Sequence, residues 1–139
     1  MTKVMCFGAF DGLHIGHLDF FRQAKKCGDY LIVSVGTNKN VEKFKGKAPL
    51  FNQAERLELI NELEVVDEAI AGVEDDFYEE IKRFKPDVIC LGYDQWAEER
   101  EVESELAKVG LKSTKVVRLA PYKSGKAKSA IVKKNSVDF

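Results

Sequence analysis

His14 and His17 are the only histidines in the sequence, and they stand three residues apart directly after a short apolar run. Gly16 lies between them and allows close backbone approach, so both imidazoles can project from one strand-to-helix turn onto one ligand. The amides and the dipole of a helix that begins there attract phosphate. The pair therefore predicts a phosphate-handling site, whereas a lone histidine in this position is usually a surface or capping group.

Other phosphate-binding motifs fail on inspection. Gly125-Lys126 lacks the glycine five residues earlier and the hydroxyl residue after lysine that a Walker A loop needs. No GxGxxG run follows the first apolar stretch either. Asp11, just before the histidines, is open to three interpretations: an acid, a metal ligand or, by default, a cap of the turn.

Short apolar runs and longer amphipathic segments alternate along the chain. The apolar runs predict five strands, at Lys3 to Phe7, Tyr30 to Val35, Glu68 to Ala71, Asp87 to Leu91 and Lys115 to Leu119. The amphipathic segments predict helices at His17 to Lys26, Gln53 to Leu63, Phe77 to Phe84 and Glu99 to Val109, with a further short helix from about Lys128. Such alternation requires right-handed crossovers, so we expect an α/β, Rossmann-like doubly wound fold: a five-stranded, mainly parallel sheet with helices on both faces, in a single domain over 1–139.

Ligands of doubly wound sheets bind beyond the carboxyl ends of the strands, where the strand order reverses beside the first strand. Asp94 follows the fourth predicted strand and is expected to accept hydrogen bonds from a ribose or a base amine, with capping as the alternative. The segment from Thr37 to Phe51 lacks a clear period and carries four lysines, so it predicts an irregular, mobile basic loop.

Composition narrows the class of protein. The chain has 139 residues and a net charge of −1, which gives no surplus of positive charge for binding nucleic acid or an acidic membrane. The 45% hydrophobic content is typical of a soluble globular domain, and Val4 to Phe10 is too short for a membrane span. Three widely spaced cysteines fit no zinc or redox motif, so we expect core thiols in a cytoplasmic protein. A homodimer stays an open alternative to a monomer.

The run from Gly8 to His17 resembles the GxFDxxHxGH signature of the small nucleotidyltransferases related to glycerol-3-phosphate cytidylyltransferase. These enzymes share HxGH with class I aminoacyl-tRNA synthetases. Lys45-Gly46-Lys47 with Glu55-Arg56, and then Leu91 to Gln95, resemble later elements of the family in the same order. Within it the chain is most similar to the archaeal FAD synthases, through the LGYDQ run and Arg118-Leu119 ahead of Tyr122-Lys123. It departs from the family at Ala9, where relatives often have threonine, and in a thinned C-terminal motif at Lys126 to Ile131.

This resemblance implies in-line transfer of a nucleotidyl group from a nucleoside triphosphate to a phosphate oxygen, with loss of pyrophosphate. The expected substrates are ATP and FMN, with CTP and a polyol phosphate such as glycerol 3-phosphate as the alternative, and Mg²⁺ accompanies the nucleotide. The alternative from a different functional class is a non-catalytic nucleotide-binding module. Because the attacking oxygen is already ionised, catalysis depends on positioning and on stabilising negative charge.

The resemblance also implies roles for individual residues. The predicted catalytic residues are His14, His17 and Lys45. The predicted nucleotide-binding residues are Ala9, Phe10, His14, Gly16, His17, Asp94, Tyr122 and Ser129. Lys47 and Arg56 are candidate phosphate contacts, and no side chain is predicted to ligate a metal. An isoalloxazine ring needs an apolar, aromatic wall, for which the candidates are Phe44, Phe51, Tyr93, Trp96 and Tyr122.

Overall fold

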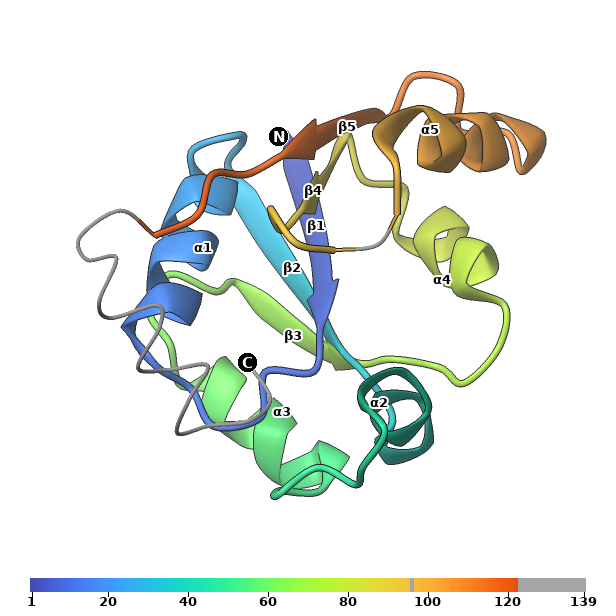
Figure 1. Ribbon diagram of the computed structural model, residues 1–139. Coiled ribbons are helices and arrows are strands. Elements are labelled where there is room, and N and C mark those ends of the chain that lie inside the picture. Colours follow the sequence, from blue (N-terminus) through green and yellow to red (C-terminus); the bar gives the residue numbers. More distant parts are fainter. Residues whose placement is uncertain (96, 123–139) are drawn as a thin grey trace.

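A computed structural model of the chain describes residues 1–95 and 97–122. Its centre is a sheet of five strands, β1 (Lys3–Gly8), β2 (Tyr30–Val35), β3 (Glu68–Ala71), β4 (Val88–Leu91) and β5 (Lys115–Arg118). The strands lie in the order β3-β2-β1-β4-β5, and every neighbouring pair is parallel (Figure 1). The predicted doubly wound sheet is confirmed.

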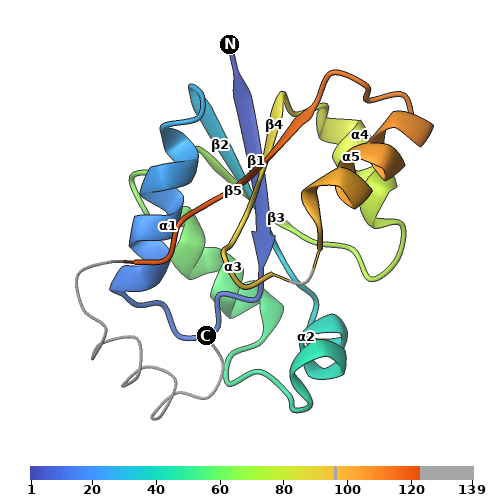
Figure 2. The same cartoon turned by 45° about the horizontal axis from the view of Figure 1, so that its top comes forward.

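Helices cover both faces of the sheet. Figure 2 shows α1 (Ile15–Lys25) and α3 (Gln53–Asn61) on one side of β1, and α4 (Phe77–Phe84) and α5 (Glu99–Lys108) on the other. The four predicted helices are confirmed, with ends that differ by at most two residues. The short helix expected from Lys128 lies outside the described residues. None of the helices in the described part is long and apolar enough to cross a membrane.

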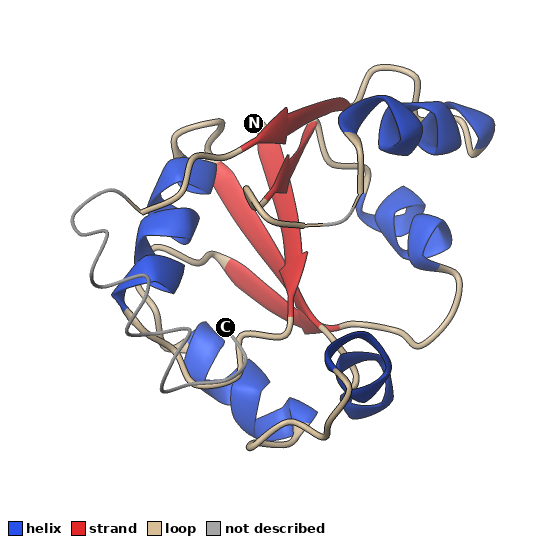
Figure 3. Cartoon of the chain, in the orientation of Figure 1, coloured by secondary structure: helices blue, strands red, loops and turns tan. Residues whose placement is uncertain are grey.

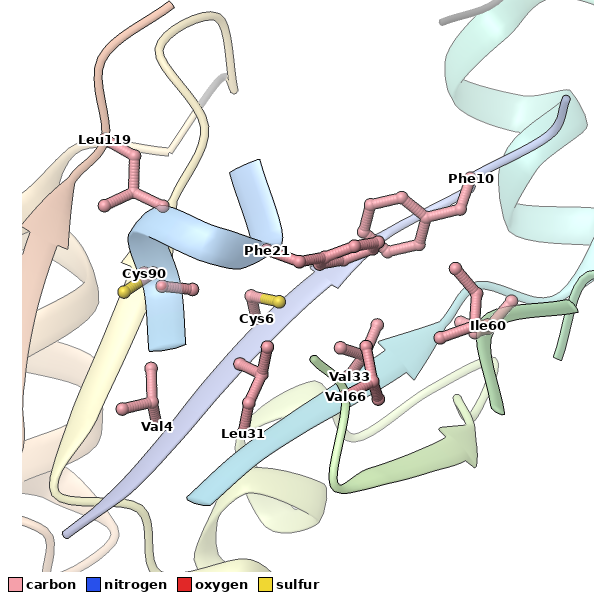
Figure 4. Close-up of a cluster of buried hydrophobic side chains, with 12 residues drawn as sticks. Val4, Cys6, Phe10, Phe21, Leu31, Val33, Ile60, Val66, Cys90 and Leu119 are labelled. Carbon is pink, nitrogen blue, oxygen red and sulfur yellow. The ribbon is translucent and has the colours of Figure 1, made fainter. Parts of the chain in front are cut away.

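Each face of the sheet has its own core, because side chains alternate along β1. Val4 and Cys6 face α1 and α3, where Phe21 and Ile60 are fully buried (Figure 4). Met5 faces the other way, into a cluster that α4 and α5 supply. Two of the three thiols, Cys6 and Cys90, are buried as predicted, and burial raises the pKa of both.

The segment after β2 corrects the sequence analysis. Thr37 to Phe51 is not irregular throughout, because it contains a helix, α2 (Asn38–Lys45), at the carboxyl end of the strands (Figure 3). The Thr37 side chain accepts a hydrogen bond from the amide of Asn40, and Gly46 ends the helix in the left-handed conformation at φ 82°. Only Val41 is buried within α2, so the apolar period that reveals a helix is missing.

The strand order reverses beside β1. The chain runs from β1 outward to β2 and β3, returns to β4 on the other side of β1, and then continues to β5. The carboxyl ends of β1 and β4 therefore meet at the switch point, where open sheets of this kind bind ligands. Residues 9–17 and 92–97 follow these two ends.

Candidate active site

The turn after β1 is fixed by an aromatic side chain that folds back on the strand. Phe10 has a left-handed backbone, φ 51°, which is unfavourable for a residue other than glycine. Its ring lies over Gly8, where an added Cβ atom would come within 2.6 Å, and its centroid is 4.9 Å from that of Phe21 (Figure 4). Phe10, predicted to bind nucleotide, thus has its side chain in the core, where it packs against Gly8 and Phe21.

His14 and His17 form a capping box at the start of α1. Nδ1 of His14 accepts a hydrogen bond from the amide of Gly16 at 3.0 Å, and Nδ1 of His17 accepts one from the amide of His14 at 3.2 Å. An imidazole whose Nδ1 accepts a hydrogen bond is neutral and carries its proton on Nε2. Both histidines are therefore held as Nε2–H donors.

Gly16 has a steric reason to be glycine. A Cβ atom there would lie 2.7 Å from the ring of His14, so any side chain would displace the imidazole. With the ring in place, the centroids of His14 and His17 are 4.0 Å apart. The HxGH spacing is thus a way to bring two imidazoles together at one helix N-terminus, as predicted from the sequence.

The surroundings of His17 keep it uncharged at neutral pH. Burial is the main cause, electrostatic interactions with His14 and Lys45 follow, and together they lower the pKa of His17 from 6.5 to about 3. A neutral donor beside a helix N-terminus can stabilise an oxyanion without an ionic charge of its own.

Asp11 joins the histidine turn to a distant segment. Its carboxylate is 1% exposed and accepts hydrogen bonds from the amides of Leu50 at 2.6 Å and Phe51 at 3.0 Å. Charge-assisted bonds of this kind are stronger than neutral ones. Among the three interpretations of Asp11, this geometry matches a cap, but of a segment 39 and 40 residues further along the chain.

Arg56, a candidate phosphate contact, is held by hydrogen bonds within the chain. The side chain is fully buried, and its guanidinium donates to the carbonyls of Phe51 and Ala9 and to Oδ1 of Asn38, all at 2.8 to 2.9 Å. Burial lowers the pKa of Arg56, and Asp11 opposes that effect. Asp11 and Arg56 together form what we call the loop clamp, which fixes 38 and 50–51 against the histidine turn.

The remaining predicted phosphate residues lie at the end of α2. Lys45 is exposed, yet close enough to His17 for its charge to lower the histidine's pKa. Lys47 is exposed in the loop that follows. Tyr122 is partly buried just after β5, and Ser129 lies outside the described residues.

The loop after β4 is held by two side chains that the sequence analysis did not single out for this task. Gln95 donates from Nε2 to the carbonyl of Phe7 at 3.0 Å and accepts the amide of Gly92 at 2.7 Å. Arg118 donates to the carbonyls of Gly92, Gln95 and Ala97, and pairs with Glu99. Asp94 is exposed on the loop thus braced. The LGYDQ and Arg118-Leu119 matches pointed to these residues without revealing that they bond to each other.

Two further features delimit the site. Within 1–95 and 97–122, no group of three His, Cys, Asp or Glu side chains has the arrangement of a metal site. A cavity of about 420 Å³ lies between α2 and the start of α3, but its lining includes Glu42 and Glu55 and none of the predicted site residues. We therefore place the candidate active site at the switch point rather than in that cavity.

Comparisons with known proteins agree with this geometry. Residues 5–135 match the cytidylyltransferase-like family. The FAD synthase of Thermoplasma volcanium is 41% identical over 139 residues, which are 100% of this chain and 96% of the relative. The FAD synthase of Aciduliprofundum boonei is 45% identical over 122 residues, covering 88% of this chain and 80% of the relative. A crystal structure from Thermoplasma volcanium, of a protein named for lipopolysaccharide core biosynthesis, has a TM-score of 0.85 and 43% identity, covering 88% of this chain and 99% of that one.

The fold and the histidine pair thus define an HxGH-type nucleotidyltransferase. The chain belongs to the cytidylyltransferase-like family and is similar to archaeal FAD synthases over its whole length. The family predicted from residues 8–17 is confirmed.

Proposed function

We propose that this chain is an FAD synthase, which transfers the adenylyl group of ATP to FMN and releases pyrophosphate. The observation that carries the proposal is the pair of neutral imidazole donors, His14 and His17, at a helix N-terminus on the switch point of the sheet. The identity to FAD synthases supports the choice of base and acceptor.

The reaction needs no covalent enzyme intermediate. An ionised oxygen of the FMN phosphate attacks the α-phosphorus of ATP, a new phosphoanhydride bond forms, and the bond to the bridging oxygen of the β-phosphate breaks. The leaving pyrophosphate takes both electrons of that bond. We treat Mg²⁺ as part of the substrate, MgATP, since this ion is bound largely by phosphate oxygens and water in nucleotide enzymes. It supplies countercharge on the phosphates.

Each side chain then has a definite task in the proposal. His14 and His17 donate from Nε2 to oxygens of the α-phosphate as negative charge grows there. Lys45, with Lys47 as its neighbour, contacts the phosphates from the end of α2. Asp94 and Tyr122 hold the ribose and the base beyond β4 and β5, and Ser129 contacts phosphate from the C-terminal motif.

A second candidate keeps the same chemistry and changes the substrates. A cytidylyltransferase would use CTP and a polyol phosphate, and the description of the family as cytidylyltransferase-like favours including it. The solved relative named for lipopolysaccharide core biosynthesis gives a reason to test a sugar phosphate as well.

The test is an end-point and rate assay of the purified chain with a matrix of nucleotides and acceptors. We expect pyrophosphate release with ATP and FMN, and FAD as the chromatographically identified product. The kcat/KM for this pair should exceed that for CTP with glycerol 3-phosphate by tenfold or more under the same Mg²⁺ concentration. The reverse preference would replace the proposed substrates, and loss of all turnover would remove the proposal.

A further inference from the structure

Three large apolar side chains are exposed within residues 44–51, in the segment after β2. Phe44 is 66% exposed, Leu50 71% and Phe51 40%. We call these residues the 44–51 apolar patch. Its members follow one another within a single short segment, at the end of α2 and in the loop that leads to α3 (Figure 1). Single exposed apolar residues are normal, but a group of them often marks a binding surface.

The patch is bonded to the histidine turn. The amides of Leu50 and Phe51 donate to Asp11, three residues before His14. Lys45, the neighbour of Phe44, lies close enough to His17 to lower its pKa. The segment that carries the patch is therefore held next to the histidine turn.

The charges beside Phe44 favour an anionic ligand at that end of the patch. Lys43 and Lys45 flank Phe44 in the sequence, and both are exposed. At the other end, Leu50 lines a cavity that also contains Glu42 and Glu55. A flat ring on a short linker to a phosphate, as in FMN, needs this combination of an apolar surface and nearby cations.

A rival apolar surface lies beyond β3. Val73 is 44% exposed and Phe77 40%, and the ring of Phe77 is already 4.6 Å from that of Phe7. Between them stand the exposed acids Glu74, Asp75 and Asp76, which would repel the phosphate of FMN. The two surfaces thus differ in charge: lysines lie beside Phe44 in the 44–51 apolar patch, whereas acids lie between Val73 and Phe77.

The adenine and isoalloxazine rings of the product, FAD, can also bind at separate places. Asp94 and Tyr122, the proposed base and ribose contacts, follow β4 and β5, whereas the 44–51 apolar patch follows β2. Since β1 lies between β2 and β4, the histidine turn separates the two regions. The base and the acceptor ring then do not compete for one surface.

We propose that the 44–51 apolar patch binds the isoalloxazine ring of FMN. This inference rests on the proposed function and adds to it the place of the acceptor. The ring packs against Phe44 and Leu50, while Lys45 attracts the phosphate toward His17.

The experiment measures flavin affinity directly, by the quenching of flavin fluorescence on binding, in Phe44→Ala and Leu50→Ala. Loss of one large apolar contact with the ring should weaken FMN binding roughly tenfold and leave the KM for ATP within a factor of two. Riboflavin, which has the ring without the phosphate, should lose affinity by the same factor. Lys45→Ala should weaken FMN binding and leave the affinity for riboflavin unchanged.

Phe77→Ala and Leu59→Ala are controls of the same residue types, since each removes an exposed apolar side chain, 40% and 47% exposed, outside the patch. Both should bind FMN like the wild type. Unchanged FMN affinity in both patch variants, in a wild type that makes FAD, would overturn the flavin position alone. A larger loss in Phe77→Ala would move the ring to the rival surface. A wild type that neither binds FMN nor makes FAD would remove this inference together with the proposed function.

Discussion

Two segments flank the histidine turn, and they are held in different ways. The loop at 92–95 and 97 is bonded from within by Gln95 and from β5 by Arg118, which contact main-chain groups at several positions. The segment at 38–51 is held by the loop clamp at 38 and 50–51 and by Asn40, which donates to the carbonyls of Val73 and Glu74, while only Val41 of α2 is buried.

This difference separates two tasks. A loop braced by many bonds presents its ligand groups in place before binding, which reduces the ordering cost of the complex. A segment that buries few of its side chains can adjust and close over a ligand. We call the segment at 38–51 the lysine side and the loop after β4, which carries Asp94, the base side. We infer that the base side is preorganised and that the lysine side moves.

The largest expected effect concerns the histidines that both segments adjoin. His14→Ala and His17→Ala should each lower kcat by a hundredfold or more, about 3 kcal/mol, because a donor aimed at growing charge is lost. Nucleotide affinity should change much less, since the charge is smaller in the ground state. Steady-state kinetics with equilibrium nucleotide binding measures both. A variant with wild-type kcat would remove the proposed role of that histidine.

The next effect tests how firmly the lysine side is attached. Asp11→Asn places an amide group opposite the amides of Leu50 and Phe51 and leaves the buried Arg56 without its nearby negative charge. We expect a loss of about 2 to 3 kcal/mol in the free energy of unfolding, measured by urea denaturation.

Asp94→Asn is the matched control for the clamp, because it makes the same change at an exposed carboxylate on the braced loop. Its effect on stability should stay within about 0.5 kcal/mol. Equal stabilities of the two variants would mean that Asp11 does not anchor the segment.

Stability should also depend on pH through His17. Its pKa is about 3 in the folded chain against 6.5 ordinarily, so between these values the unfolded chain binds the extra proton. The contribution of His17 to the free energy of unfolding is therefore fully present above pH 6.5 and is lost as the pH falls toward 3. The loss between pH 7 and 5 is about 2 kcal/mol. His17→Gln should show that much less loss over the same interval. If the free energy of unfolding fell equally with pH in the two proteins, a group other than His17 would be responsible.

The sequence was sufficient for the sheet because each strand is a compact apolar run. Capping signals can also be found in the sequence where they are local: Asn52 and Glu55, three residues apart, form a capping box at the start of α3. The histidine pair was found for the same reason, since both partners of its hydrogen bonds lie within three residues.

Other features escaped because their causes are distant in sequence. Asp11 bonds to amides 39 and 40 residues away, and nothing in its local run indicates them. Arg56 was named as a candidate phosphate contact from the family resemblance, and no local signal indicated its hydrogen bonds to the carbonyls of Phe51 and Ala9 and to Oδ1 of Asn38. For α2, only the Thr37 and Gly46 caps carried a signal.

The smallest expected effect sharpens the contrast between the two segments. Lys45→Ala should reduce kcat/KM about tenfold, since one exposed cation near the phosphates contributes about 1.4 kcal/mol. Lys43→Ala, two residues earlier on α2 and also exposed, is the matched control and should change kcat/KM by less than threefold. Equal effects would point to the general charge of the segment instead of one contact.

Hydrogen exchange then shows whether this contact accompanies closure. Amides of 38–51 should gain protection when MgATP is added, because Val41 is the one buried residue of α2. Amides of 92–97 should change little, because Arg118 and Gln95 already hold that loop. In Lys45→Ala the gain on 38–51 should be smaller, whereas the loop at 92–97 should behave as in the wild type. Equal protection of both segments with and without MgATP would mean that the lysine side is as rigid as the base side, and the division of tasks between them would fall.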